Sequence, residues 1–229
     1  MHYRLAIEDM EPNHWIAWVL DLPACFSPAK TRDEAIDNTP EVIAQYFVWL
    51  VNHNSALPVS NATIETEVVE SFQSFPSEKD PEYIVNAFFN DDRRPMGYWE
   101  VEVVAGLLDW TRQDLLSVLN SMISTDLNKP IAGEVQGSIA GILRHIAIAE
   151  DWYFSQLGFA LERWQIPKDP YGMLKTVREN TQKQLIKLVG TEQITENNSE
   201  QWSARKVLRR TLWHERDHTQ HITKLLAGS

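Results

Sequence analysis

The segment His214-Glu215-Arg216-Asp217-His218-Thr219-Gln220-His221 holds three of the seven histidines of the chain. The chain continues through the apolar Ile222 and Leu225, which favours a packed helix over a polar tail. Each residue of an α-helix turns by about 100°, so positions four and seven apart return to nearly the same face. The three histidines are therefore predicted to form one stripe of imidazoles. Imidazole is the commonest protein ligand for transition metals, so this stripe predicts a metal site.

The bulk composition indicates a globular, acidic protein. The 229 residues suffice for two domains, and 43% hydrophobic with 23% charged residues can supply a sizeable core. The formal net charge of −11 argues against binding to nucleic acid or to an anionic membrane, which both need basic patches. Cys25 is the only cysteine, which excludes an intramolecular disulfide. Residues Met1–Leu5 lack the apolar core of a secretion signal, and the most apolar run, Tyr46–Val51, is too short to span a bilayer. We expect a soluble cytoplasmic protein.

The first half of the chain, residues 1–92, is predicted to be an α+β domain. Thr31, with Glu34 three residues later, forms a capping box that begins a helix. Pro40 is expected to distort the early turns of this helix. Acidic residues and a proline predict a turn at residues 8–13. Alternating or apolar runs predict strands at Tyr3–Ile7, Trp15–Leu20 and Thr63–Val69, and a short strand or docking segment at Tyr83–Phe89.

Two stretches of this half carry a family resemblance. Asp21-Leu22-Pro23-Ala24-Cys25-Phe26, followed by Thr31-Arg32-Asp33-Glu34-Ala35-Ile36, resembles the HicB-type antitoxin fold over roughly residues 1–70. That family has two strands, a D-L-P-G-C turn and a helix that opens with T-x-x-E-A. Ala24 replaces the usual glycine, which leaves the geometry of the turn open. HicB proteins often carry a separate DNA-binding segment, of which this sequence gives no sign, so no repressor role is implied. The alternative is a small α+β domain whose turn letters agree by chance.

A charged segment, Asn90-Asp91-Asp92-Arg93-Arg94-Pro95-Met96-Gly97, is predicted to divide the chain into domains 1–92 and 93–229. The second domain is predicted to be an all-α, up-down four-helix bundle, because four amphipathic helices can bury their apolar stripes against one another. Breaks are expected at residues 128–130 and 166–170, and a polar connection at residues 190–200. The apolar stripes run over Val101–Met122, Ile139–Tyr153, Leu174–Leu188 and Val207–Leu225.

A fourth histidine, His145, lies among apolar residues of the second of these helices. A single histidine in such a place is more often a core residue than a metal ligand. The spacing of His214 and His218 on another helix favours the ligand interpretation, since bundle cores build metal sites from facing helices. The alternative for the last helix is a solvated face with incidental histidines. The charged residues expected on its solvated side are Arg209, Arg210, Glu215, Arg216 and Asp217.

Two kinds of metal site are compatible with the spacing of these histidines. The first is a protease site. His214-Glu215-Arg216-Asp217-His218 satisfies the H-E-x-x-H pattern of zinc metalloproteases, in which Glu215 would be the general base. Those enzymes usually take a third ligand downstream, and only eleven residues follow His218. The extended metzincin pattern requires a histidine where Lys224 stands. The protease is therefore the less favoured alternative.

The second kind of site rests on Leu143-Arg144-His145-Ile146-Ala147-Ile148-Ala149-Glu150 together with His214 and His218. In this order the two motifs resemble the DinB/YfiT-like family of four-helix bundles, over about residues 97–226. The resemblance implies that His145, His214 and His218 bind a divalent transition metal, with zinc or nickel favoured. The family often has glutamine where this chain has His221, which leaves three roles open for this residue: a ligand, a hydrogen-bond partner or a packing residue. The favoured prediction is that His221 supports the ligands without binding the metal itself.

The resemblance also implies chemistry at the metal, because three protein ligands leave coordination positions open. Members of the superfamily resemble thiol-dependent transferases and isomerases, and some look like hydrolases. A small electrophile is then the expected substrate, with a low-molecular-weight thiol as a further cofactor. Glu215 and Glu150 are candidate proton carriers, with surface or salt-bridging carboxylates as the alternative role. Trp152 and Trp213 could line a cavity, although aromatic residues at helical spacing are usually core residues.

A non-catalytic function is the rival hypothesis. In it the HicB-like domain binds a partner protein or forms a homodimer, and the helical domain is a scaffold. The acidic charge is compatible with a small basic partner.

Overall fold

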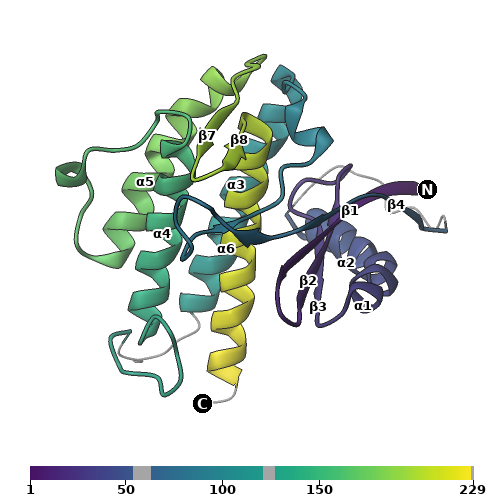
Figure 1. The fold of residues 1–229 in the computed structure, drawn as a ribbon. Helices are drawn as coiled ribbons and strands as arrows, with labels where there is room; N and C mark the ends of the chain where they lie inside the picture. The colour runs from purple at the N-terminus through teal and green to yellow at the C-terminus, as the bar shows by residue number, and fades with distance from the viewer. Residues whose placement is uncertain (54–62, 121–126, 228–229) are drawn as a thin grey trace. The chain divides into compact units, whose positions relative to one another are not determined.

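The computed structural model describes residues 1–53, 63–120 and 127–227 (Figure 1). The chain divides into two compact units. The first comprises Met1–Arg93 with the short segment Glu196–Gln201, and the second comprises Arg94–Thr195 with Trp202–Ser229. Within the described ranges, no helix combines the length and the apolar character that crossing a membrane requires.

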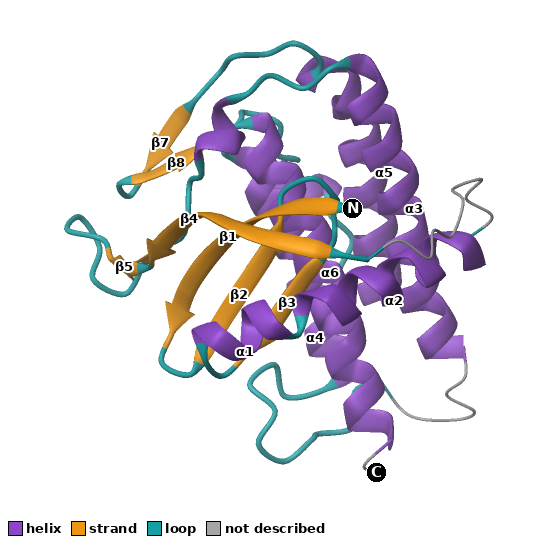
Figure 2. Ribbon diagram, turned by 90° about the vertical axis from the view of Figure 1, so that its right-hand side faces the viewer, coloured by secondary structure: helices purple, strands orange, loops and turns teal. Residues whose placement is uncertain are grey.

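The first unit contains a four-stranded mixed sheet in the order β3-β2-β1-β4 (Figure 2). β1 and β2 form an antiparallel hairpin with Ile7 opposite Ala17, and β4 lies parallel to β1 on its other side. The family resemblance predicts an α+β fold, and this mixed sheet confirms it. The strands are β1 (His2–Glu11), β2 (His14–Val19), β3 (Phe26–Ala29) and β4 (Glu65–Gln73).

The predicted strands lie where the structure has strands, but their first and last residues differ from the prediction. β1 continues to Glu11, so the turn predicted at residues 8–13 is confined to Pro12 and Asn13. Asn13 has φ of 63°, a left-handed conformation that asparagine adopts more readily than most residues. β3 was missed, because four residues that include Pro28 show no alternation of apolar and polar side chains.

Two helices, α1 (Arg32–Asp37) and α2 (Thr39–Asn52), pack against this sheet. The predicted cap is confirmed, since the hydroxyl oxygen of Thr31 accepts a hydrogen bond from the amide of Glu34 at 3.3 Å. The prediction of one distorted helix was wrong. Pro40 lies in the first turn of α2, where its missing amide hydrogen leaves no bond unmade, so it begins a second helix.

The turn before β3 has a backbone conformation that usually requires glycine. Ala24 has φ of 68°, in the left-handed region that favours glycine, and the amide of Cys25 donates to the carbonyl of Leu22 at 3.0 Å. Alanine in this conformation costs about 1 kcal/mol relative to glycine. Cys25 is buried in the core.

The side chain of Glu8 is a buried anchor in β1. Its carboxylate accepts hydrogen bonds from the indole of Trp18 at 2.8 Å, the amide of Ala87 at 2.7 Å and the hydroxyl of Ser74 at 3.3 Å. The bond from Ala87 fastens the segment predicted at residues 83–89 to the sheet. That segment is a short strand over two residues and a docked, buried chain beyond them. The smaller elements of this unit are β5 (Phe75–Pro76), β6 (Ile84–Val85) and the 3₁₀ helix η1 (Asn90–Arg93).

The second unit is helical. α4 packs against α5 and α6, and α3 packs against α5 and α6 (Figure 1). Met122, predicted to extend the first apolar stripe, lies outside the described residues. The long helices among the described residues are α3 (Tyr98–Asn120), α4 (Ile139–Ser155), α5 (Pro170–Leu185) and α6 (Ala204–Ala227).

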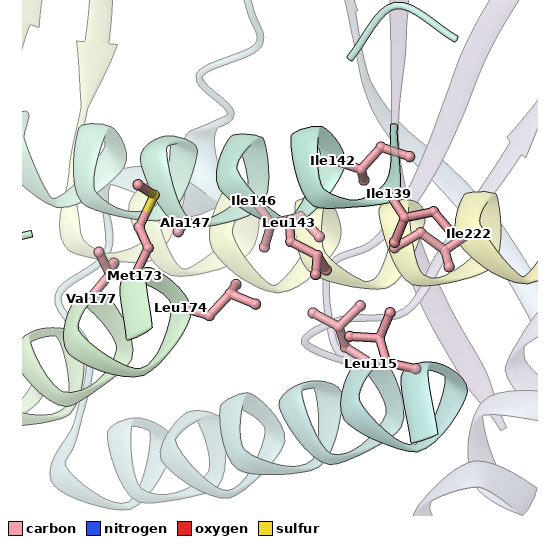
Figure 3. Close-up of a cluster of buried hydrophobic side chains, with 11 residues drawn as sticks. Leu115, Ile139, Ile142, Leu143, Ile146, Ala147, Met173, Leu174, Val177 and Ile222 are labelled. Carbon is pink, nitrogen blue, oxygen red and sulfur yellow. The ribbon is translucent and has the colours of Figure 1, made fainter. Parts of the chain in front are cut away.

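Apolar side chains from these four helices meet in one core (Figure 3). An amphipathic helix is only marginally stable by itself, and burial of the apolar face of each helix in this core stabilises all four. The buried members of the core are Leu115, Leu119, Ile139, Ile142, Leu143, Ile146, Ala147, Met173, Leu174, Val177 and Ile222.

The connection predicted as polar at residues 190–200 contains a small hairpin. Its strands are β7 (Thr195–Asn197) and β8 (Glu200–Trp202), with Asn198 and Ser199 at positive φ between them. Strands of three residues are too short for a periodic signal, so the hairpin within this polar connection was not predicted. Two 3₁₀ helices complete the unit, η2 (Arg163–Gln165) and η3 (Ile186–Leu188).

Candidate metal centre

The start of α4 fixes the position of His145 along that helix. Ser138 caps the helix, and its hydroxyl oxygen accepts a hydrogen bond from the amide of Gly141 at 3.2 Å. His145 follows one turn later, next to the buried Ile146, and is itself half-buried. A histidine at the border of an apolar stripe can direct its ring into the helical unit while its backbone stays near the surface.

α6 supplies the other two histidines of the proposed triad. The hydroxyl oxygen of Ser203 accepts a hydrogen bond from the amide of Lys206 at 3.3 Å, in the manner of a helix cap. Further along, His214 is buried, His218 is half-buried and His221 is exposed. The predicted stripe of three imidazoles therefore divides into an inner pair and an outer residue.

The three imidazoles of His145, His214 and His218 converge through their Nε2 atoms. Nε2 of His214 lies 3.1 Å from Nε2 of His145 and 3.1 Å from Nε2 of His218. The ligand atoms of the group all lie within 4.8 Å of one another. The structure thus brings together, from two helices, the three residues that the sequence predicts as ligands.

The surroundings of these histidines favour neutral rings. Burial, followed by the neighbouring His218 and His145 and by Arg210, holds the pKa of His214 well below its usual value. Burial and the other imidazoles lower the pKa of His218 to about 4. Burial also lowers the pKa of His145. A neutral imidazole has a free lone pair on one ring nitrogen, which is the form that binds a metal.

The group fits a divalent transition metal. Two nitrogens that each lie about 2.0–2.1 Å from one ion are separated by roughly 3.0–3.4 Å. The separations of 3.1 Å on both sides of His214 fall in this range. His218 Nδ1 is buried and has no hydrogen-bond partner among the described residues, so packing rather than an acceptor orients its ring. Imidazole nitrogens suit zinc, copper, iron and nickel alike, so the preference for zinc or nickel stays a prediction.

Aromatic rings surround His214. The rings of Tyr153 and Trp213 lie edge-on to its imidazole, with centroid distances of 5.9 and 5.8 Å. Trp152 is half-buried and packs against Tyr153 and Trp202 instead, with ring-centroid distances of 5.4 and 5.2 Å. These apolar walls account for much of the desolvation of His214.

The two carboxylates predicted as proton carriers lie in a buried ion network. Glu150 of α4 accepts from Arg178 Nε at 2.8 Å and from Arg112 at 3.1 Å. Glu215 of α6 accepts from Arg178 at 2.8 Å, and also from Arg112 and from the hydroxyl of Thr111. Each of the four helices contributes one charge, since Arg112 belongs to α3 and Arg178 to α5. This geometry matches the salt-bridging role that was the alternative for both carboxylates.

The network favours the ionised forms of Glu215 and Arg178. Burial opposes the charge of Glu215, yet Arg178 and Arg112 outweigh it and lower the pKa of Glu215 to about 2. Burial likewise opposes the charge of Arg178, and Glu150 and Glu215 raise its pKa above the usual value. Glu215 is 1% exposed and Arg210 6% exposed, so the prediction that both lie on a solvated face was wrong. Because Glu215 follows His214 directly, the network also fixes the rotation of α6 that aims the imidazole.

Arg112 and Arg178 were not predicted from the sequence. A signal for them exists, because Arg112 stands between Leu108 and Leu115 in an apolar stripe and Arg178 follows the buried Val177. A charged residue at an apolar position of one helix predicts an opposite charge on a facing helix. Glu134, on the loop before α4, was also missed. Its carboxylate lies 2.8 Å from Nε2 of His221.

Comparisons with known proteins identify the first unit. The family model for the HicB-like antitoxin of bacterial toxin–antitoxin systems matches residues 3–75. UPF0150 protein Ta0767 of Thermoplasma acidophilum is 37% identical over 62 residues, which are 27% of this chain and 90% of that protein. Through its N-terminal unit the chain belongs to the HicB-like antitoxin family. No solved structure matches the chain.

The matched residues end at 75 and include none of the three histidines. The HicB-like prediction is confirmed. The DinB/YfiT-like resemblance of the helical unit stays a prediction.

Proposed function

We propose that the chain joins a protein-binding HicB-like domain to a metal-binding domain of the DinB/YfiT-like kind. The proposed domains are residues 1–92 and residues 93–229, the second an up-down four-helix bundle. Protein binding has the stronger support, because the first unit belongs to a family of antitoxins from toxin–antitoxin systems. Family membership favours a partner protein over a small-molecule substrate for this unit.

The distribution of charge indicates the chemistry of the partner. Residues 1–93 contain 16 acidic and 5 basic residues, a formal charge of −11, whereas residues 94–229 contain 16 of each. The entire net charge of the chain is therefore carried by the N-terminal part. A uniformly acidic domain attracts a basic protein and repels nucleic acid. We accordingly expect a small basic partner.

Co-purification with small basic proteins encoded beside its gene tests this function. We expect one of them to form a stable complex on size-exclusion chromatography with light scattering, and the complex to weaken as the salt concentration rises. A variant with Glu65→Gln and Glu67→Gln, both exposed on β4, should bind more weakly than the wild type. Glu179→Gln with Glu192→Gln, which removes the same charge from the helical unit, is the control. A homodimer without any partner, or binding insensitive to salt, would contradict the proposal.

Metal binding is the second proposed function, and one observation carries it. Nε2 of His214 lies 3.1 Å from Nε2 of His145 and 3.1 Å from Nε2 of His218, and the ligand atoms of all three imidazoles lie within 4.8 Å of one another. His145, His214 and His218 would hold the ion, and the buried network behind α6 would keep His214 in place. An ion held by three nitrogens acts as a Lewis acid at its open positions and lowers the pKa of bound water or thiol. This chemistry suits a thiol S-transferase or a hydrolase of small electrophiles.

The contacts of Glu215 and Glu150 argue against proton transfer by either residue. Both carboxylates are buried and engaged by arginines, so neither is placed to accept a proton from a ligand of the metal. The same contacts argue against the H-E-x-x-H protease, since its general base would be Glu215.

Isothermal titration of the metal-free protein with Zn²⁺ and Ni²⁺ tests the site. We expect one ion per chain, and a loss of affinity of several orders of magnitude in the His214→Ala variant. His53→Ala, which removes a histidine of the N-terminal unit, is the control. A wild-type protein that takes up neither ion would overturn the metal function.

A further inference from the structure

The loop that precedes α4 contains a compact turn. The amide of Ile131 donates to the carbonyl of Gly137 at 2.9 Å, and the amide of Gly137 donates to the carbonyl of Glu134 at 3.0 Å. Gly133 and Gly137 have φ of 78° and 74°, which glycine adopts without strain. The turn therefore has a defined shape that presents Glu134 in one orientation.

A close approach of backbones fixes this turn on α4. A Cβ atom added to Gly141 would lie 1.9 Å from the carbonyl oxygen of Gln136. Only glycine at this position lets the turn lie directly against the first turn of the helix. His145 stands one helical turn further on, so the placement of the turn relative to the triad is built into α4.

The carboxylate of Glu134 is enclosed and held at both oxygens. One oxygen accepts from the amide of Gln136 at 2.9 Å, and the other lies 2.8 Å from Nε2 of His221. The side chain of Glu134 is 6% exposed, whereas that of His221 is 45% exposed. Burial opposes the charge of Glu134, but the hydrogen bonds from Gln136 and His221 outweigh it and lower its pKa.

The negative charge of Glu134 reaches the triad. Its carboxylate lies 2.8 Å from Nε2 of His221, and the ring centroid of His221 lies 6.3 Å from that of His218, so only one side chain separates the charge from a ligand of α6. The carboxylates predicted from the sequence, Glu150 and Glu215, have their charge compensated by two arginines. Glu134 is thus the carboxylate placed to act electrostatically on an ion held by the triad.

We propose that Glu134, held by His221, is the charge-compensating residue of the metal centre and determines which ligands the bound ion accepts. This inference rests on the proposed metal binding. A buried negative charge beside a divalent ion stabilises the ion and disfavours a further anion at its open position. The centre therefore favours protic neutral ligands, such as water or a thiol, over small anions. His221 is a positioning residue, which explains how it supports the ligands without binding the ion.

Two measurements on purified full-length protein test this role without relying on activity. The first is the Zn²⁺ affinity of the wild type, Glu134→Gln and His221→Asn, with Glu179→Gln on α5 as a control for the loss of one charge. We expect Glu134→Gln to weaken zinc binding by about 10–100-fold, His221→Asn by less, and Glu179→Gln not at all. The second is the affinity of azide for the cobalt-loaded proteins, read from their visible spectra. We expect azide to bind several-fold more tightly to Glu134→Gln than to the wild type.

The outcomes separate this inference from the proposed function. If the wild type binds zinc and Glu134→Gln matches Glu179→Gln in both measurements, Glu134 has no such role and the metal site stands. If the wild type binds no metal, both are overturned. Equal urea midpoints for all variants would show that the changes are not caused by unfolding.

Discussion

Neutralising Glu215 should destabilise the helical unit strongly and alter its response to acid. The Glu215→Gln variant keeps the size of the side chain and removes one of the four charges that link α3, α4, α5 and α6. Two buried arginines then share a single carboxylate, that of Glu150. A buried charge without compensation costs several kcal/mol.

The magnitude follows from the pKa of Glu215. The difference between 4.5 for a free glutamate and about 2 in the folded protein corresponds to about 3 kcal/mol at neutral pH. The pKa is lower in the folded state, so this stabilisation is complete above about pH 4.5 and is lost as the pH falls toward 2. At pH 3 roughly half of it remains.

Urea denaturation followed by far-ultraviolet circular dichroism provides the assay. The wild type should be about 3 kcal/mol more stable than Glu215→Gln at pH 7, and the difference should shrink to about half of that at pH 3. Glu179→Gln, which changes an exposed carboxylate on α5, should stay within about 0.5 kcal/mol of the wild type. A Glu215→Gln protein within 1 kcal/mol of the wild type at pH 7, or a difference independent of pH, would refute this account of the network.

Four further predictions concern other parts of the chain. Ala24→Gly should stabilise the first unit by about 1 kcal/mol in urea denaturation, because glycine relieves the left-handed strain at φ of 68°; an unchanged midpoint would mean that the turn is not strained. Glu8→Gln should lower the stability of the first unit by about 1–3 kcal/mol, because an amide cannot accept all three hydrogen bonds, and thermal denaturation should show it; a neutral substitution would argue against the anchor. The metal-free protein should lose stability between about pH 6.5 and 4, because the unfolded chain protonates His218 at a pH where the folded protein keeps it neutral; His218→Phe should remove part of that dependence in urea titrations across this range. Gly141→Ala should weaken zinc binding although it leaves every donor atom intact, because the added methyl group displaces the turn that carries Glu134; an affinity equal to that of the wild type would show that the turn can shift without consequence.

The sequence predicted the features that depend on local pattern. The cap at Thr31 and the apolar stripes of the helices need only residues a few positions apart, and the structure has them where the pattern places them. The HicB-like assignment rested on a short turn and a helix start, and the family match confirms it. The three histidines were found because the spacing of His214 and His218 and the apolar setting of His145 are themselves local signals.

The features that depend on contacts between distant segments were not predictable in this way. Arg112 and Glu215 are separated by 103 positions, and nothing near either residue identifies the other as its partner. Glu134 and His221 are in contact although 87 positions separate them in the sequence. Glu134 lies in a loop, where no periodic pattern of apolar residues indicates its partner. The assignment of Glu215 to a solvated face failed for the same reason, since helical periodicity gives the angle of a residue and not what the neighbouring helix places opposite it.

The four-charge network has a consequence for how this helical unit can change over evolutionary time. Its two arginines and two glutamates sum to zero, and each belongs to a different helix. Loss of any one of them alone leaves the other three unbalanced inside the protein, whereas simultaneous replacement of an oppositely charged pair by apolar residues can be tolerated. Relatives of the helical unit should therefore keep all four charges or lose them in pairs. We expect these four charged positions to vary together among relatives, even where the loop that carries Glu134 diverges.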